Sequence, residues 1–339
     1  MEKKLFLIST PSQAFFLKQS PELINKAVLV IAVPTNEQKK KILYHLKGYQ
    51  WTSIHVLKIP QSVGKFSYIK ILGFGIWLQY FKLKYPSFNE VFFGSYNNHY
   101  NMSLVAEYEN SAKLHLLYDG MQMVAVSQSR KEKTKGIRPL PSFFKFLGLK
   151  QAKINKLNFI GPLPIKVEGE DTYSALKNEM SYKHPIPQED TVVFVGQPLI
   201  GNFIINEDFY YKSLLRLKEK FPDKHFIYAP HHREKVEHIQ EIKKIMDIAV
   251  FSEIFEEKFI SSEKFPGTVI TFYSSALLNL CYLQAKIKLY AIKIPYSKFI
   301  RKDVYPNYEV VLNYIEESDY PYLSFLDLKT DRKKSISHS

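Results

Sequence analysis

Cysteine is nearly absent from the chain, which has one in 339 residues, Cys281. A fold that depends on internal disulfide bonds is therefore excluded, and a reducing compartment is expected. Cys281 ends the apolar run 277–281, where the favoured interpretation is a buried small hydrophobic side chain rather than a nucleophile. The composition of 45% hydrophobic and 24% charged residues is that of a folded protein, which excludes a disordered chain.

Long hydrophobic runs are also missing. The apolar residues 5–8 are interrupted by Ser9, Thr10 and Pro11, which is too early for a secretory signal. The most apolar internal stretch, residues 71–81, is bounded by Lys70 and Lys82 and is much shorter than the ~20 residues that cross a bilayer. We therefore expect no transmembrane segment.

Several catalytic signatures are missing as well. There is no phosphate-binding loop of the G-x-x-x-x-G-K-[ST] type, no G-x-G-x-x-G and no G-x-S-x-G elbow. No D-x-D pair is present to hold a cation for a nucleoside diphosphate sugar, and His232 and His238 do not have the i, i+4 spacing of a helical zinc pair. We expect neither a metal site nor a cofactor.

Positive charge is present in excess. Lys and Arg number 47 against 33 Asp and Glu, a formal net charge of +14, which favours anionic partners. Within residues 130–153, eight basic residues face one acid and alternate with Phe and Leu. This segment either lies on an anionic membrane surface or is a solvated loop followed by a core helix. No recognised nucleic-acid motif accompanies the charge, so we expect no nucleic acid, and a nucleic-acid-binding protein is the remote alternative.

The pattern of β-type runs predicts the architecture. Runs near residues 4–8, 27–34, 53–60, 90–95 and 115–118 alternate with helical segments, and a second series begins at 191 with further runs at 225, 249, 268 and 287. Such alternation is typical of parallel sheets with crossover helices. We predict an α/β fold of two Rossmann-like domains whose parallel sheets face a central cleft. The expected boundaries are residues 1–160, a linker at 161–188, a second domain at 189–315 and a tail at 316–339.

Polar residues follow four of these runs where each one ends. They are Asp119, then Gln197, then His231 and His232, and finally Ser274 and Ser275, with Gly196 beside Gln197 as a further candidate for donor binding. The carboxyl ends of parallel strands meet at one edge of a sheet, so these groups are expected to converge. Alternatives remain open for each, since Asp119-Gly120 is also a turn pattern, Gln197 can belong to a plain turn, and Ser274 is a natural helix N-cap. A helix N-terminus with two hydroxyls is also a phosphate site, and the two roles are compatible.

A further set of polar residues lies in the first half of the chain. These candidates for acceptor or sugar contacts, each of which can also be an ordinary turn residue, are Thr10, Gln13, Ser95, Asn97 and Gly120.

Taken in order, these short motifs resemble the bacterial sialyltransferases of the two-Rossmann-domain (GT-B) type, including lipooligosaccharide and capsule sialyltransferases and polysialyltransferases. That family has a D/E-D/E-G motif, an H-P motif and a paired Ser/Thr motif, which are matched by Tyr118-Asp119-Gly120, His231-His232 and Ser274-Ser275. Tyr118 stands in place of the leading acid, and His232 stands in place of the proline. The opening "LISTPSQAFFL" and the run "FVGQPL" also resemble the starts of the two domains, and the order holds across nearly the whole chain.

The resemblance implies an enzyme, a metal-independent inverting glycosyltransferase that moves sialic acid from CMP-sialic acid to a hydroxyl of a cell-surface glycan. Asp119 is then the expected base for the acceptor hydroxyl, and His231, as a cation or a hydrogen-bond donor, stabilises the departing phosphate together with Ser274 and Ser275. His232 either contacts phosphate or only replaces proline. The expected partners are the nucleotide sugar and the glycan, and the expected location is cytoplasmic, with segment 130–153 as the candidate contact to the inner face of the bacterial inner membrane.

Two other interpretations stay open. One is a glycosyltransferase of the same fold that uses another nonulosonic acid or a nucleoside diphosphate sugar. The other is a catalytically silent scaffold on the membrane, which would not require Asp119 and His231. The acceptor sugar, the linkage, single or processive transfer, and the oligomeric state do not follow from the sequence.

Overall fold

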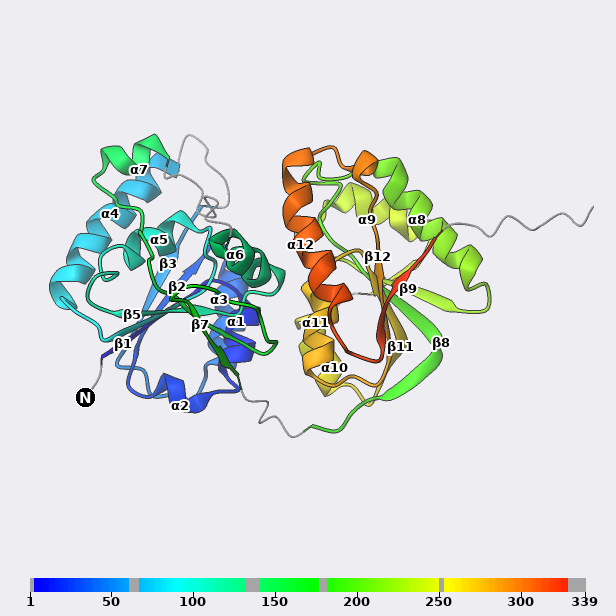
Figure 1. Ribbon diagram of the computed structural model, residues 1–339, viewed down its shortest axis with the longest axis horizontal. Helices are drawn as coiled ribbons and strands as arrows, with labels where there is room; N and C mark the ends of the chain where they lie inside the picture. The colour runs from blue at the N-terminus through cyan, green and yellow to red at the C-terminus, as the bar shows by residue number, and fades with distance from the viewer. Residues whose placement is uncertain (1–2, 61–66, 132–140, 177–181, 250–252, 329–339) are drawn as a thin grey trace, which may run out of the picture. The chain divides into compact units, whose positions relative to one another are not determined.

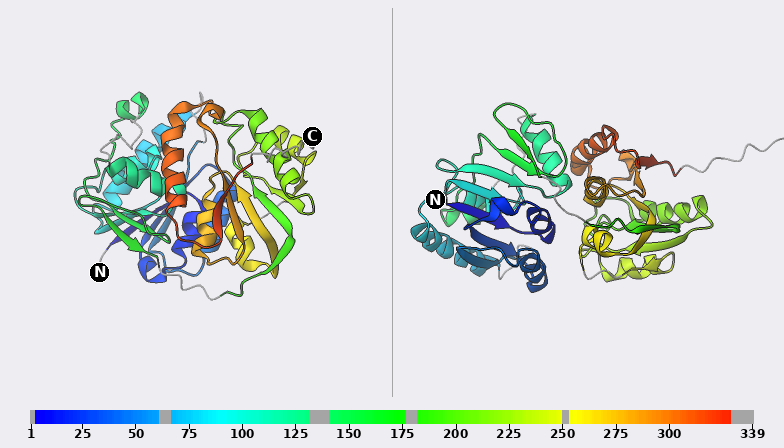
Figure 2. Two further views of the ribbon diagram at one scale, coloured as in Figure 1. Left: turned by 45° about the vertical axis from the view of Figure 1, so that its right-hand side comes forward. Right: turned by 90° about the horizontal axis from the view of Figure 1, so that it is seen from below.

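The computed structural model describes residues 3–60, 67–131, 141–176, 182–249 and 253–328. The chain divides into two compact units, residues 1–181 and residues 182–339. Each unit is built on a parallel sheet with helices on both faces (Figures 1 and 2). None of the described helices is long and apolar enough to cross a membrane.

The first unit contains, within its described residues, a seven-stranded sheet in the order β3-β2-β1-β4-β5-β6-β7. Its strands are β1 (Lys4–Ile8), β2 (Val28–Val33), β3 (Ser53–Lys58), β4 (Glu90–Phe93), β5 (Lys113–Leu117), β6 (Asn158–Gly161) and β7 (Thr172–Ala175). Its helices are α1 (Pro11–Leu17), α2 (Pro21–Ile24), α3 (Asn36–His45), α4 (Ser67–Lys84), α5 (His99–Val105), α6 (Met121–Lys131) and α7 (Ser142–Phe146).

The second unit has, over the residues described, a six-stranded sheet in the order β10-β9-β8-β11-β12-β13. The strands are β8 (Ile186–Val195), β9 (His225–Ala229), β10 (Asp247–Ile248), β11 (Lys264–Thr271), β12 (Lys288–Ile292) and β13 (Leu323–Leu326). The helices are α8 (Glu207–Lys220), α9 (Val236–Lys243), α10 (Phe255–Ser261), α11 (Ser275–Tyr282) and α12 (Tyr305–Glu316), with 3₁₀ turns at Tyr296–Lys298 and Lys302–Val304.

Both sheets have the strand order of a doubly wound Rossmann fold. The chain first builds outward on one side of β1 or β8 and then returns to the other side, so the order reverses between β1 and β4 and between β8 and β11. Ligands of such sheets bind beyond the carboxyl ends of the strands at this switch point. The prediction of two parallel-sheet Rossmann-like domains is confirmed.

The cores explain why these runs form central strands. Every residue of β2 is buried, as expected for a parallel strand covered on both faces by helices. In the first unit, the rings of Phe6 and Phe92 stack at 4.4 Å, and His115 stacks on Phe92 at 4.3 Å. Burial lowers the pKa of His115 to about 4, so this histidine is a neutral part of the core.

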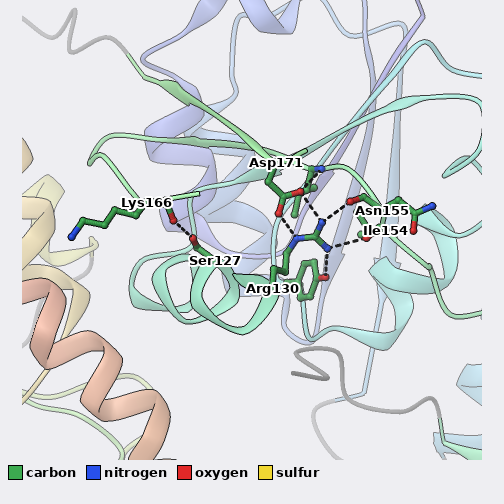
Figure 3. Close-up of polar contacts among 8 residues, drawn as sticks. Ser127, Arg130, Ile154, Asn155, Lys166 and Asp171 are labelled. Carbon is green, nitrogen blue, oxygen red and sulfur yellow. Dashed lines mark hydrogen bonds and ion pairs between the residues drawn. The ribbon is translucent and has the colours of Figure 1, made fainter. Parts of the chain in front are cut away.

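Arg130, near the end of α6, holds the edge of the first sheet (Figure 3). Its guanidinium makes a two-pronged ion pair with Asp171, with Nε at 2.6 Å and Nη2 at 2.7 Å from the carboxylate oxygens. It also donates to the carbonyls of Ile154 and Asn155. Asp171 directly precedes β7, so β7 is an integral strand of the first unit, although it lies within residues 161–188, which the sequence suggested as a linker.

This geometry also corrects part of the membrane hypothesis for residues 130–153. Arg130 is committed to its largely buried pair with Asp171 and is no cation for lipid, whereas Lys131 pairs with Glu168 at 2.6 Å on the surface. Phe144 is buried, whereas Phe146 is exposed. Lys133, Lys135 and Arg138 lie outside the described residues.

The far end of the chain also differs from expectation. Residues 316–339 were expected to form a tail, yet β13 pairs with β12 from Leu289↔Leu323 to Ile292↔Leu326 and completes the second sheet. The run predicted at 249–253 follows β10, and its residues 250–252 lie outside the described part of the chain.

Candidate active site

Asp119 lies just beyond the carboxyl end of β5, in the first unit. Its carboxylate accepts a hydrogen bond from the Ser95 hydroxyl at 3.1 Å and a longer one from the Thr10 hydroxyl at 3.5 Å. Thr10 follows β1, and Ser95 follows β4, so the two donors come from the loops that flank the switch point. The structure therefore brings together three of the residues selected from the sequence.

Gln13 joins these two loops through hydrogen bonds to both of them. Thr10 is the N-cap of α1, and its hydroxyl accepts from the Gln13 amide at 3.2 Å, while the Gln13 side chain accepts from the backbone of Ser9 at 2.8 Å and Thr10 at 3.3 Å. This is a capping box, with Pro11 in the first turn. The other end of the Gln13 amide donates to the Ser95 hydroxyl at 3.0 Å. Gln13 is buried, so its role is to orient Ser95, which in turn orients Asp119.

Gly94 is needed for this arrangement and was missed by sequence reasoning. A Cβ at this position would lie 2.2 Å from the side-chain amide of Gln13. The next residue, Ser95, has a positive φ of 55°, a left-handed conformation that is unfavourable for a serine and is held here by its two side-chain hydrogen bonds. Buried Asn101 supports the loop by donating to the Gly94 carbonyl at 2.9 Å and to the Ser9 hydroxyl at 3.0 Å.

Asn97 and Gly120 complete the predicted set in this unit. The side-chain oxygen of Asn97 is buried and has no hydrogen-bond partner among the described residues, so a polar acceptor is left over in the β4–α5 loop. Gly120 has a φ of 63° and lets the chain turn from Asp119 into α6. This positive φ explains why a glycine stands at position 120. The turn that the Asp-Gly pattern predicts is therefore present, and the Asp119 carboxylate is also held by hydrogen bonds.

In the second unit, Gln197 bridges the switch point between β8 and β11. Its side-chain oxygen accepts from the Tyr273 amide at 3.0 Å and from the Thr271 hydroxyl at 3.2 Å. Gln197 therefore ties the two central strands together, and only its amide nitrogen remains for a ligand. The neighbouring Gly196 donates its own N–H to the Ala229 carbonyl at 2.8 Å, so this amide is used within the sheet rather than for phosphate.

His231 lies in the turn that follows β9. Its Nδ1 accepts from the backbone N–H of Arg233 at 3.2 Å, which places the ring proton of the neutral imidazole on Nε2. Burial, and then the nearby charges of His232 and Arg233, lower the pKa of His231 to about 3. Of the two roles expected for His231, the structure favours the neutral hydrogen-bond donor over the cation. The ring of His232, the more exposed of the two, lies 4.2 Å from the ring of His231.

Glu234 holds this turn in place and was also missed by sequence reasoning. Its carboxylate accepts from the backbone N–H of His231 at 2.6 Å and from the Tyr228 hydroxyl at 2.5 Å. Since Tyr228 donates to Glu234, the contact of 2.6 Å between the hydroxyls of Tyr210 and Tyr228 has Tyr210 as its donor. The spacing His-x-x-Glu, in which an acid reaches back to a backbone amide three residues earlier, is the signal that could have identified it.

This network explains Gly196. A Cβ there would lie 2.4 Å from both the Glu234 carboxylate and the Tyr228 hydroxyl. Desolvation raises the pKa of Glu234 to about 7, although its two hydrogen bonds act in the opposite direction. The backbone of His231 is thus held by a buried acid whose pKa is raised by desolvation.

Ser274 and Ser275 begin α11, directly after β11. Ser274 is the N-cap, and its hydroxyl accepts from the Ala276 amide at 3.3 Å, so the capping role is confirmed. Ser275 is the first helical residue and is half-buried. Both serines lie at the switch-point edge on which Gln197 also lies. Across the described ranges, no group of three or more His, Cys, Asp or Glu side chains could hold a metal ion.

The two sheets and the placement of these residues define a fold of the GT-B type, which solved structures share. The UDP-GlcNAc 2-epimerase from Neisseria meningitidis, bound to UDP-GlcNAc, is 10% identical with a TM-score of 0.53, covering 94% of this chain and 92% of that chain. MnaA from S. aureus, in a co-structure with UDP, is 11% identical with a TM-score of 0.52, covering 95% and 90%. TcCGT1 in complex with UDP is 8% identical with a TM-score of 0.50, covering 96% and 86%. At these identities the likeness concerns the fold alone.

The sequence gives a more specific match. Residues 166–295 match glycosyltransferase family 52. For that segment the match confirms the resemblance drawn from the motifs. It also confirms the expected enzyme class, a glycosyltransferase. The matched segment contains all of the candidate residues of the second unit, Gly196, Gln197, His231, His232, Ser274 and Ser275. Among curated proteins, no sequence matches the chain.

Proposed function

We propose that this chain is a metal-independent, inverting sialyltransferase that uses CMP-sialic acid and a hydroxyl of a cell-surface glycan, of the lipooligosaccharide or capsule type. The observation that carries the proposal is the match to glycosyltransferase family 52 over the segment in which His231 and the two serines follow their strands. The organised carboxylate of Asp119 in the first unit supplies the remaining chemical group.

Asp119 is the proposed general base. As the acceptor oxygen bonds to the anomeric carbon of the donor sugar, its proton passes to the Asp119 carboxylate, and the bond from that carbon to the phosphate oxygen breaks with its electron pair on CMP. The donor carbon passes through an oxocarbenium-like transition state as CMP departs. The acceptor hydroxyl must lose its proton as it bonds to that carbon, so a base is needed within hydrogen-bond reach. The hydroxyls of Ser95 and Thr10 fix the direction of the carboxylate, so less orientation is required when the acceptor arrives.

The second unit supplies the groups for the leaving phosphate. The Nε2–H of neutral His231 is a hydrogen-bond donor whose position is set by Glu234 through the backbone and by Arg233 through Nδ1. The hydroxyls of Ser274 and Ser275 offer further donors at a helix N-terminus, where negative charge is stabilised. Dipolar donors of this kind stabilise developing charge without a metal ion.

A donor and acceptor panel tests the proposal. The purified chain is incubated with CMP-sialic acid and a set of galactosides and sialosides, with CMP release and the mass of the product as readouts. We expect CMP release that depends on the acceptor, together with a product heavier by one sialyl residue. Calorimetry with CMP, CDP and UDP accompanies it. If UDP binds much more tightly than CMP and no sialyl product forms, the chain uses a nucleoside diphosphate sugar and the proposal is wrong.

A further inference from the structure

Helix α4 carries apolar side chains on two opposite faces. Ile71, Phe74, Leu78 and Phe81 are buried and pack toward the first unit. On the other side, five large apolar side chains are exposed, namely Ile69 (70%), Leu72 (48%), Ile76 (65%), Tyr80 (58%) and Leu83 (83%). A surface helix of a globular protein normally has polar residues opposite its buried face, so this outer face is unusual.

The exposed residues form a continuous stripe. At 3.6 residues per turn, they fall within about 80° of one another around the helix axis. The four buried residues lie on the opposite side of the same projection. We call residues 69, 72, 76, 80 and 83 the α4 stripe. A row of this length is not a scatter of single exposed hydrophobic residues, and contiguous exposed patches mark interaction sites.

The charges that α4 itself carries have one sign. Helix α4, "SYIKILGFGIWLQYFKLK", contains no acid, and it contains Lys70, Lys82 and Lys84. Lys82 is paired with Glu107 at 2.5 Å, which leaves Lys70 and Lys84 beside the stripe. In the helical projection these two lie on the same flank.

Helix α7 lies beside one end of α4 (Figure 1). The ring centroids of Tyr68 and Phe143 lie 4.6 Å apart, and the rings of Phe143 and Phe146 are stacked with their centroids 6.4 Å apart. Phe146 is 84% exposed, and the exposed Lys145 precedes it. Residues 141–156 contain no acid either.

We propose that the α4 stripe, with Phe146, docks this chain on an anionic membrane surface, with α4 lying in the plane of the headgroups. An interfacial helix of this kind has an apolar face that enters the headgroup and acyl boundary and lysines that meet anionic lipid. The tyrosines suit that position, because their rings are apolar and their hydroxyls remain in water. The part of residues 130–153 that contributes is α7.

Charge argues against a second copy of the chain as the occupant. If two α4 stripes packed antiparallel, Lys70 of one copy would face the Lys82 and Lys84 end of the other. A parallel pairing would place each lysine next to its own counterpart. Neither arrangement offers an acid from α4, whereas anionic lipid neutralises the lysines in any orientation.

Vesicle sedimentation tests the proposal without any donor or acceptor sugar, so its outcome is independent of the proposed reaction. The full chain is mixed with phosphatidylcholine vesicles and with vesicles that also contain phosphatidylglycerol. We expect binding to the anionic vesicles only. The double variant Ile76→Glu/Leu83→Glu should lower the partition coefficient about 100-fold, since two apolar side chains no longer enter the interface. The double variant Lys70→Gln/Lys84→Gln should lower it about 25-fold, about fivefold for each lysine.

A matched control lies in the second unit. Val236 (64% exposed) and Ile300 (55% exposed) are also apolar surface residues, so Val236→Glu/Ile300→Glu adds the same charge away from α4. It should bind vesicles as the unchanged chain does, and circular dichroism should show every variant folded. The proposal is overturned if the unchanged chain does not sediment with anionic vesicles, or if the α4 variants bind as well as the control. It is also overturned if the α4 variants instead convert a dimer to a monomer in light scattering.

Discussion

At the scale of single residues, the side chains that surround Asp119 have divided roles. Thr10 and Ser95 touch the carboxylate, whereas Gln13 does not touch it and acts through its hydrogen bonds to these two residues. The proposed base is therefore positioned by loops that follow three different strands. Its direction is fixed before any substrate binds, which is the condition under which a general base is effective.

Replacement of Asp119 by Ala is expected to reduce turnover by about 10²- to 10³-fold, because the acceptor hydroxyl loses the group that takes its proton. The measurement is CMP release under saturating donor, with circular dichroism to confirm the fold. Asp208→Ala, which removes an exposed carboxylate of α8, is the control and should retain full turnover. Turnover near that of the unchanged chain in Asp119→Ala would refute the assignment.

The second residue-scale prediction concerns Glu234. Its pKa is raised to about 7 in the folded chain from an ordinary value of 4.5. Between these values the folded state holds a proton that the unfolded state has released, so the free energy of unfolding falls as pH rises through this window. Glu234→Gln removes the titrating group, and relative to the unchanged chain it should gain about 2 kcal/mol on going from pH 5 to pH 8.

Urea unfolding at the two pH values measures this difference, followed by a signal from the second unit. The comparison between variant and unchanged chain isolates Glu234 from other groups that titrate in the same range, among them His231, whose lowered pKa acts with the opposite sign. An identical pH dependence in the two proteins would show that Glu234 is not the buried acid described here.

The residues recovered from the sequence and those that were missed differ in a physical way. Asp119, His231 and Ser274 each follow a β-type run, and strand ends can be recognised from local pattern. Glu234 could have been identified only through its local contact with the His231 backbone, whereas Gly94 owes its role to a contact across space with Gln13. A single sequence carries no record of such a close approach.

At the scale of elements, the strands β6, β7 and β13 were not predicted, whereas the edge strand β3 was expected at residues 53–60. β7 is four residues long, "TYSA", and none of them is fully buried, so no apolar run marks it. Its position depends on the Arg130–Asp171 pair and on the Leu157 amide, which donates to Asp171 at 2.9 Å. The central strands β1, β2, β4 and β5, in contrast, were recognised because burial on both faces requires continuous apolar residues. The central strand β6, "NFIG", is buried as well, but it is too short an apolar run to stand out.

Loss of Arg130 should therefore loosen β7. Arg130→Met leaves the largely buried carboxylate of Asp171 without its partner and should lower the free energy of unfolding of the first unit by about 3 kcal/mol. The double variant Arg130→Met/Asp171→Asn should cost less, because no unpaired charge remains. Denaturant unfolding of both variants checks the order, and equal losses would argue against the ion pair as the anchor.

A second element-scale prediction concerns the loop between β4 and α5. The Cβ of Gly94→Ala would displace the buried Gln13 amide, which cannot move without losing hydrogen bonds to Ser9, Thr10 and Ser95. We expect a loss of about 1–3 kcal/mol in unfolding free energy and a loss of turnover as Asp119 loses its support. Gly73→Ala, in the open middle of α4, is the control and should raise stability by up to about 1 kcal/mol. Equal behaviour of the two variants would contradict the proposed role of Gly94.

At the scale of the whole molecule, the division into two units separates the two sets of site residues. Every contact described around Asp119 is made within residues 1–181, and every contact around His231 and Ser274 is made within residues 182–339. The second unit has its own hydrophobic core, in which Phe194, Tyr210 and Phe272 pack together.

A fragment of residues 182–339 is therefore expected to fold and to bind CMP with an affinity within about tenfold of the full chain, without any transfer activity, because phosphate recognition rests on its own donors. Calorimetry measures the affinity, and circular dichroism checks the fold. A folded fragment with no affinity for CMP, beside a full chain that binds it, would place the nucleotide contacts in the first unit instead.

The repeated strand order has an evolutionary consequence. The first unit holds its reactive groups at the switch point between β1 and β4, and the second unit holds its own at the switch point between β8 and β11. One unit can therefore change in sequence while the other stays the same. Chimaeras that graft the first 181 residues of a relative onto residues 182–339 of this chain should inherit acceptor preference from the graft and nucleotide preference from the host.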